Sequence, residues 1–210
     1  MHLRARSASP PRMRQGDSLI LPLPRPYSLF ALLVPVGLFL FFGRLFVGDL
    51  YYQRAMSLKQ QVYLDAAAAS LRRAISWQPG NALYHRELGR VYMAMSSWRR
   101  DRKRWIEQGI FAYRRALALN PHDSETAFDL GWAYIAAGRV GDAGGAFRSG
   151  LQVDPHNPAL LISLGAAYQA QGKLQEARKF LVYALELSPL QRDAIRRQIQ
   201  AIDLALARSR

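Results

Sequence analysis

The chain has 210 residues, half of them hydrophobic, and carries a net charge of +14 with no cysteine. The hydrophobic fraction excludes global disorder, and the missing thiols exclude disulfides, cysteine nucleophiles and cysteine-ligated metals. The net charge suggests a nucleic-acid partner, but the positions of the charged residues along the chain do not. Residues 121–189 hold seven acidic and five basic side chains, a net of −2, so the positive excess lies at the margins of the chain. A nucleic-acid-binding module would concentrate this charge on its fold, so we expect no nucleic-acid partner.

The first 26 residues combine five arginines with five prolines. Such a mixture does not form a packed element, and we expect residues 1–26 to be a disordered basic tail. Arginine also dominates the whole chain, with 25 arginines against four lysines. We interpret this bias as that of a GC-rich, bacterial genome.

An apolar segment follows the tail, without a charged residue from Tyr27 to Gly43 and with a second aromatic flank at Tyr51. A helix from Tyr27 to Tyr51 would be about 36 Å long, enough to cross a hydrocarbon core of about 30 Å. The alternatives are a cleaved signal peptide and a buried core helix. No small-residue cleavage site follows the segment, however, and little else in the chain could cover an apolar cylinder.

We therefore expect residues 27–50 to be a single transmembrane signal anchor. Arginines crowd its N-terminal flank, and cytoplasmic flanks are rich in positive charge. The predicted topology is a single pass through a bacterial inner membrane, with the N-terminus in the cytoplasm and the rest of the chain in the periplasm.

Residues 127–155 and 161–189 align with each other without gaps, at a period of 34 residues. The matched pairs are Leu130-Gly131 with Leu164-Gly165, Tyr134 with Tyr168, Gly138 with Gly172, Ala143 with Ala177, and Pro155 with Pro189. This pattern resembles the tetratricopeptide repeat (TPR). The resemblance implies an all-α solenoid of helix hairpins that stack into a right-handed superhelix.

A third copy runs from Leu88-Gly89 to Pro121 and carries eight extra residues, which fall at its inter-helix turn within residues 97–106. A degenerate copy ends at Pro79 and lacks the Leu-Gly pair, and its first helix would extend the membrane helix. The predicted solenoid thus spans residues 51–189, with about three full repeats and one degenerate repeat. We expect residues 190–210 to form an amphipathic capping helix.

The insertion is basic and bears two tryptophans. Its candidate contact residues are Trp98, Arg99, Arg100, Arg102, Lys103, Arg104 and Trp105. Eight residues are about two helical turns, so the simplest accommodation lengthens one or both helices of the hairpin. The seven-residue spacing predicts that Trp98 and Trp105 share a face. Such a protrusion near a bilayer suits anionic lipid or the acidic rim of a membrane partner, and a solvated, idle extension is the alternative.

The family resemblance also implies a concave groove, lined by the first helix of each hairpin, that binds peptides or partner proteins. The candidate groove residues are those outside the repeat signature, namely Arg86, Arg90, Glu125, Phe128, Asp129, Trp132, Ile162 and Gln169. Arg86 and Arg90 share a helix face and could bind a carboxylate, or they could be solvated. Trp132 is either an anchor for a partner or a packing residue against a neighbouring helix.

No nucleophile–base pair or catalytic carboxylate pair stands out, so we expect no enzyme, no cofactor and no metal. His122 and His156 occupy equivalent turns, too far apart to share a metal. We interpret Gly144, Gly145 and Gly150, in the second helix of one repeat, as drift in a packed helix.

The predicted function is a membrane-anchored scaffold or adaptor, without catalysis, for protein–protein interaction in a membrane or cell-envelope complex. One alternative is a periplasmic, chaperone-like assembly factor that captures client tails. Another is a truncated relative of glycan polymerases and ligases that end in such repeats, which the single membrane segment disfavours.

Overall fold

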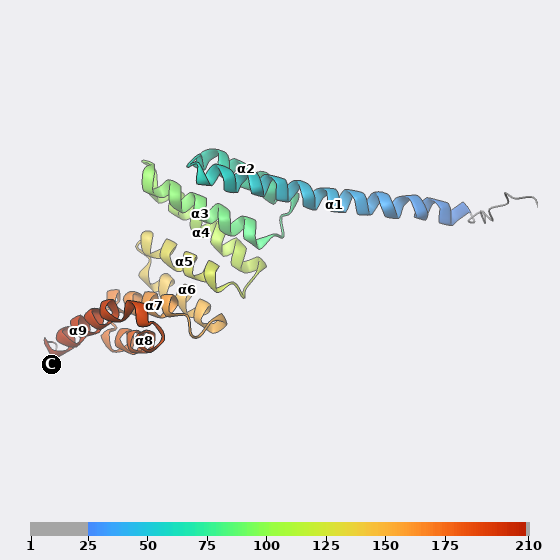
Figure 1. Ribbon diagram of the computed structural model, residues 1–210. Helices are drawn as coiled ribbons and strands as arrows, with labels where there is room; N and C mark the ends of the chain where they lie inside the picture. Colours follow the sequence, from blue (N-terminus) through green and yellow to red (C-terminus); the bar gives the residue numbers. More distant parts are fainter. Residues whose placement is uncertain (1–24, 209–210) are drawn as a thin grey trace, which may run out of the picture. The chain divides into compact units, whose positions relative to one another are not determined.

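The computed structural model describes residues 25–208, with side chains from residue 33 onward, and every regular element in this range is helical (Figure 1). The elements are α1 (Arg25–Gln60), α2 (Leu64–Trp77), α3 (Ala82–Trp98), α4 (Arg102–Leu119), α5 (Ser124–Ala136), α6 (Val140–Val153), α7 (Pro158–Ala170), α8 (Leu174–Leu187), the 3₁₀ turn η1 (Pro189–Gln191) and α9 (Arg192–Arg208). The prediction of an all-α fold is confirmed for these residues. The predicted basic tail lies outside them, apart from its last two residues, which begin α1.

The chain divides after Phe41 into two units. In the first unit, the described residues form the N-terminal part of α1. The second unit holds the rest of α1 and all the other helices.

Within the second unit, consecutive helices pack as hairpins, α1 with α2, α3 with α4, α5 with α6 and α7 with α8 (Figure 1). Neighbouring hairpins meet through α2 and α3, α4 and α5, and α6 and α7, while α9 packs on α8. Among the described residues, the main helix contacts run between neighbours in chain order, so the helices form a solenoid.

An asparagine or aspartate begins the first helix of each of the last three hairpins. Asn81, Asp123 and Asn157 each accept a hydrogen bond from a backbone amide of the helix that follows, at 3.0–3.2 Å. Each stands two residues after a proline that closes the preceding repeat. Proline stops one helix and the capping side chain starts the next, so residues close in sequence determine where each repeat ends and the next begins.

The turns inside the last two hairpins depend on glycine. Gly138 and Gly172 both have a φ of 75°, in the left-handed region that glycine adopts without steric cost. In each turn, the glycine amide donates to the carbonyl three residues earlier and the next amide donates to the carbonyl five residues earlier, at 2.8–3.0 Å. This arrangement reverses the chain within three residues.

The insertion lengthens both helices of the second hairpin. α3 and α4 have 17 and 18 residues, whereas the corresponding helices of the next two hairpins have 13 and 14. The eight extra residues therefore divide equally, four at the end of α3 and four at the start of α4. The prediction of longer helices is confirmed, and the hairpin extends by about one helical turn.

Candidate protein-binding surfaces

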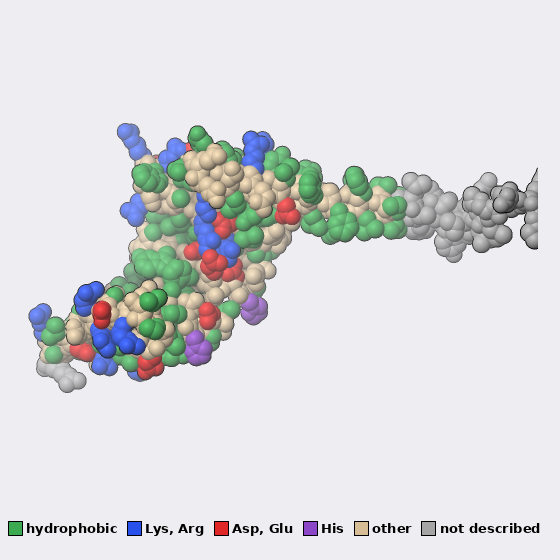
Figure 2. Space-filling model, in the orientation of Figure 1, with side chains coloured by type: hydrophobic (Ala, Val, Ile, Leu, Met, Phe, Trp, Pro, Cys, Tyr) green, Lys and Arg blue, Asp and Glu red, His purple; other side chains and the backbone are tan. Residues whose placement is uncertain are grey.

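Charged side chains link α3 to α5, the first helices of adjacent hairpins. Arg86 Nη1 donates to carboxylate oxygens of Asp123 at 3.1 Å and Glu125 at 2.8 Å. Arg90 Nε donates to Asp129 at 2.7 Å, and its Nη2 donates to Glu125. Figure 2 shows basic and acidic side chains side by side over this part of the solenoid.

The same network continues to α1. Glu87 is almost fully buried, and its carboxylate accepts from Lys59 Nζ at 2.7 Å and from Arg90 Nη1 at 2.9 Å. A buried carboxylate is stable only when it is paired, so Lys59 and Arg90 are needed by the fold itself. We call these residues on α1, α3 and α5 the inner charge network.

Arg86 and Arg90 are paired within the chain in this arrangement, and binding of a partner's carboxylate by them stays a prediction. Both guanidinium groups are already paired with acids of the chain, two of which, Glu125 and Asp129, are themselves predicted groove residues. Opposite charges on stacked helices attract each other, so a partner's carboxylate would compete with the acidic side chains of α5 for these guanidinium groups.

Burial and pairing pull the pKa values of this network in opposite directions. The hydrogen bond from Arg90 lowers the pKa of Glu125, whereas burial raises the pKa of Asp129 despite the same arginine. Burial opposes the charge on Arg90, but its hydrogen bonds to Glu125 and Asp129 outweigh burial and raise its pKa. Asp129 therefore relies on Arg90 to offset part of the effect of burial on the pKa of its carboxyl group.

An aromatic cluster lies beside this network on α5. The Trp132 ring contacts those of Phe128 and Phe147 edge-on, with centroids 6.3 and 6.2 Å apart. Phe147 of α6 is fully buried, and Phe128 is partly buried against the same core. Trp132 remains 47 % exposed. It therefore packs against the neighbouring helix and still offers half of its surface to a partner.

The two remaining candidates lie on α7. Ile162 is partly buried in the core shared by α7, α8 and α9, and Gln169 is exposed. Among the predicted groove residues, Trp132 and Gln169 are the exposed members that take no part in the inner charge network.

The two tryptophans of the insertion occupy different environments. Trp98 ends α3 and is 81 % exposed, whereas Trp105 lies on α4, half-buried, with its ring centroid 5.8 Å from that of Tyr92. The prediction that they share a face is wrong, because the chain reverses between them at residues 99–101. Trp105 belongs to the core, and only Trp98 is available as a contact.

Most of the basic side chains of the insertion are exposed. Arg99 pairs with Asp65 at the start of α2, and Arg104 stacks over the Trp105 ring at 5.5 Å. Arg100, Arg102 and Lys103 lie on the surface around the turn.

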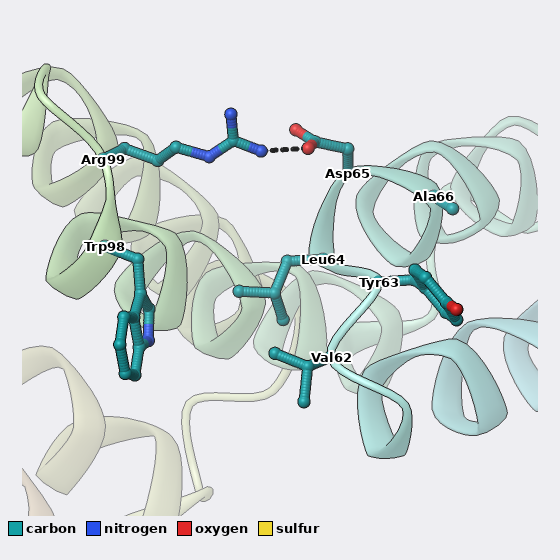
Figure 3. A pocket seen from close by; sticks show the side chains of 7 residues that line it. All are labelled: Val62, Tyr63, Leu64, Asp65, Ala66, Trp98 and Arg99. Atoms are coloured by element: carbon teal, nitrogen blue, oxygen red, sulfur yellow. Dashed lines mark hydrogen bonds and ion pairs between the residues drawn. The ribbon is translucent and has the colours of Figure 1, made fainter.

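A hollow of about 340 Å³ separates the end of α3 from the turn between α1 and α2 (Figure 3). Its lining residues are Val62, Tyr63, Leu64, Asp65, Ala66, Trp98 and Arg99. The sequence does not predict the part of this lining that comes from Val62–Ala66, because nothing in it shows that the turn between α1 and α2 lies next to the insertion.

Comparison with known proteins agrees with the architecture. Models of the tetratricopeptide repeat family match residues 48–81, 106–158 and 136–194. The first of these segments includes the repeat predicted to be degenerate, whose first helix is the C-terminal part of α1. No curated protein matches the chain at a significant level.

Solved structures share the fold at low sequence identity. MamA matches with a TM-score of 0.60 and 24 % identity, over 66 % of this chain and 77 % of that one. The thermophilic TPR protein TTC0263 of Thermus thermophilus gives 0.59 and 21 %, over 75 % and 81 %. The first TPR domain of Spaghetti (RPAP3), bound to an HSP90 peptide, gives 0.54 and 22 %, over 60 % and 94 %. At these identities the likeness concerns the fold alone.

Proposed function

We propose that this chain of tetratricopeptide repeats is a non-catalytic scaffold or adaptor that α1 anchors in a bacterial inner membrane, with its repeats in the periplasm bound to a protein partner. The observation that carries the proposal is that the N-terminal part of α1 is apolar and exposed. Among the described residues, Leu33–Gln60 is the one helix long and apolar enough to cross a membrane, and 6 % of its apolar stretch is buried.

The exposed side chains of this stretch are large. They include Leu33, Val34, Val36, Leu38, Phe39, Leu40, Phe41, Phe42 and Phe46. Burying a fully exposed side chain of this kind gains about 1.5–3 kcal/mol, and these side chains are 47–76 % exposed, so a bilayer is the environment that suits such a helix. The arginine-rich flank before it supports a cytoplasmic N-terminus.

The repeats supply the binding surface of the proposed scaffold. Repeat solenoids present extended surfaces to their partners, and the RPAP3 domain with the same fold holds a peptide. On this chain the exposed half of Trp132, supported by Phe128 and Phe147, is the feature of the first helices best suited to anchor a partner.

The topology can be tested with reporters fused after Arg210. A reporter that is active only in the periplasm should be active, and one that is active only in the cytoplasm should be silent. The opposite result would overturn both the orientation and the compartment of the repeats.

The binding surface can be tested by purification in a mild detergent with mass spectrometry of co-eluting chains. A stoichiometric companion supports the scaffold, and a mixture of sub-stoichiometric clients supports the assembly factor instead.

Trp132→Ala should weaken capture of the companion by about 2 kcal/mol, roughly 30-fold. Trp77→Ala is the matched control, because Trp77 is similarly exposed on α2. Unchanged capture by a folded Trp132→Ala variant would remove the first helices from the binding surface.

A further inference from the structure

The turn between α1 and α2 has the same backbone as the glycine turns of the later hairpins. The Val62 amide donates to the Lys59 carbonyl at 3.1 Å, and the Tyr63 amide donates to the Leu58 carbonyl at 2.9 Å. These are the bonds made around Gly138 and Gly172, and Val62 has a φ of 64° against 75° for the two glycines. A valine thus occupies the position where the other turns use glycine.

Valine is poorly suited to this position. A β-branched residue in the left-handed region is a genuine outlier, because its side chain clashes with the backbone, and glycine avoids that cost. Burial does not compensate, since Val62 is 68 % exposed. A strained, solvent-facing valine has no explanation in the fold of the chain alone, and such strain is found where a residue serves a contact.

The neighbours of Val62 form an apolar surface with it. Tyr63 and Trp98 are also mostly exposed, and all three residues line the hollow at the end of α3, with the Tyr63 ring pointing away from Trp98 (Figure 3). We call Val62, Tyr63 and Trp98 the tip patch. The extra turn of α3 is what carries Trp98 to this place, so the insertion and the strained turn contribute to one surface.

The surroundings of the tip patch are positively charged. Residues 98–105 hold five basic side chains and one acidic side chain, a net of +4. Arg99 is already paired with Asp65, but Arg100, Arg102 and Lys103 are exposed at the turn. An occupant that complements this surface carries acidic side chains around an apolar one.

The place of the tip patch along α1 favours a protein over a lipid surface. Arg44 donates to the Trp77 carbonyl, at the end of the first hairpin opposite the tip patch, and the exposed apolar side chains of α1 continue to Leu50. Gln60, beside the tip patch, is 10 residues beyond Leu50, about 15 Å along the helix axis. Within this hairpin the tip patch therefore lies at the end away from the apolar side chains of α1, which favours a protein segment as its occupant.

We propose that the tip patch docks an acidic segment of a partner protein, which places an apolar side chain in the hollow between Val62 and Trp98 and its carboxylates on Arg100, Arg102 and Lys103. The inference rests on the proposed protein-binding role, but it needs neither Trp132 nor the predicted compartment.

The test uses the full chain in nanodiscs of neutral lipid and fluorescein-labelled 15-residue peptides, with binding followed by anisotropy. The first peptide alternates glutamates with leucines, the second replaces the glutamates by lysine, and the third replaces the leucines by serine. We expect the first peptide to bind at least tenfold more tightly than the others. Raising the salt from 50 to 300 mM should weaken it, because the arginines and lysine are exposed.

Two variants locate the site. Trp98→Ala should weaken binding of the glutamate–leucine peptide at least tenfold with an unchanged Tm, because Trp98 is 81 % exposed, and Trp77→Ala should leave peptide binding unchanged. Val62→Gly should raise Tm by about 2 °C or more, since it relieves the left-handed valine, while it weakens the peptide severalfold. Greater stability with weaker binding is the signature of a residue kept for contact.

Several results would overturn the docking site. Equal binding of the three peptides, or normal binding by Trp98→Ala, would remove the tip patch as a peptide site. A lower Tm in Val62→Gly would make Val62 a packing residue. Loss of binding of the nanodisc-held chain to anionic vesicles in Trp98→Ala, without a change in peptide binding, would assign the surface to lipid. In each case, a Trp132-dependent companion would leave the scaffold itself standing.

Discussion

At the scale of single residues, the Leu-Gly pair of each full repeat marks the closest approach of two helices. A Cβ added to Gly89 would lie 2.6 Å from the Tyr113 ring, and one added to Gly165 would lie 2.9 Å from Leu181. At Gly131 the Phe147 ring would be closer still. The three partners come from the second helix of the same hairpin, so the sequence signature records a single recurring contact.

The glycines of α6 do not share one explanation. Gly150 faces Leu160 of α7 and Ala127 of α5, at 2.9 and 3.3 Å from an added Cβ, so it is a packing residue and the interpretation as drift is wrong there. A Cβ added to Gly145 would meet no atom within 4 Å, and drift accounts for this glycine. Composition could not separate the two, because a glycine that is needed and one that is tolerated look the same in one sequence.

This difference predicts opposite effects of the same substitution. Gly131→Ala should lower the free energy of unfolding by about 1–3 kcal/mol, because Phe147 is buried and cannot move aside. Gly145→Ala should raise it by about 0.5–1 kcal/mol through better helix propensity. Urea denaturation followed by circular dichroism measures both. Equal destabilisation by the two variants would mean that α6 is packed more tightly than the structure indicates.

At the scale of helices, the sequence period predicts the hairpins and the longer second hairpin, but not where that hairpin reverses. Residues 96–105 contain neither glycine nor proline, and Asp101, which precedes α4, makes no side-chain cap hydrogen bond, so the turn at 99–101 has only a weak sequence signal. For this reason the spacing alone places the two tryptophans on one helix. Their true separation follows from the reversal of the chain between α3 and α4 at residues 99–101.

The inner charge network is a second feature of helix stacking that spacing alone does not reveal. Arg90 and Asp129 are 39 residues apart, and their contact follows from the register in which α3 meets α5. The four-residue spacing of Arg86 and Arg90 correctly places them on one face. The acidic side chains that pair with them come from the next hairpin, at the start of α5 and along it.

We predict that the inner charge network stabilises the solenoid. Arg90→Ala should lower the free energy of unfolding by about 1.5–3 kcal/mol at neutral pH, because Glu87 and Asp129 lose a charged hydrogen-bond donor. Arg178→Ala is the control, since its 2.7 Å bond to Asp203 lies on the exposed surface and should be worth less than about 1 kcal/mol.

The destabilisation caused by Arg90→Ala should depend on pH through the carboxyl group of Asp129. Burial raises the pKa of Asp129 above its unfolded value of 3.8, so the folded state binds a proton more readily and gains stability from Asp129 as the pH falls. The loss caused by Arg90→Ala should therefore shrink toward about pH 4. An Arg90→Ala variant that stays fully stable but no longer captures the partner would restore the arginines as a carboxylate-binding pair.

At the scale of the whole molecule, composition and pattern predict the repeats and an apolar helix, but cannot name a partner. The apolar stretch needs only length and hydropathy to be recognised, whereas the tip patch and the inner charge network each join residues from separate hairpins. Local signals such as the capping residues and the turn glycines are readable in sequence. Surfaces made by stacking are not, because they depend on the register between repeats.

The stacking order also sets how the molecule loses its structure. α9 buries Ile195, Ile199 and Ile202 against α7 and α8, where they complete a core with Leu161 and Leu181. Among the described residues, no residue of α9 belongs to the core clusters that contain side chains of the first two hairpins. Damage to α9 should then spread through the nearest hairpin first.

We therefore predict a local response to Ile202→Ala. Ile202 is fully buried, and its truncation should destabilise the C-terminal hairpin by about 2–5 kcal/mol, whereas Leu204→Ala, two residues away and mostly exposed, should stay within about 0.5 kcal/mol of the parent. Hydrogen exchange should show faster amides in α7, α8 and α9 and unchanged protection in α3 and α4, since each hairpin is held by its neighbours alone. A uniform loss of protection from α2 to α9 would instead mean that the solenoid opens as one cooperative body, and the independence of the tip patch from the C-terminal repeats would fall with it.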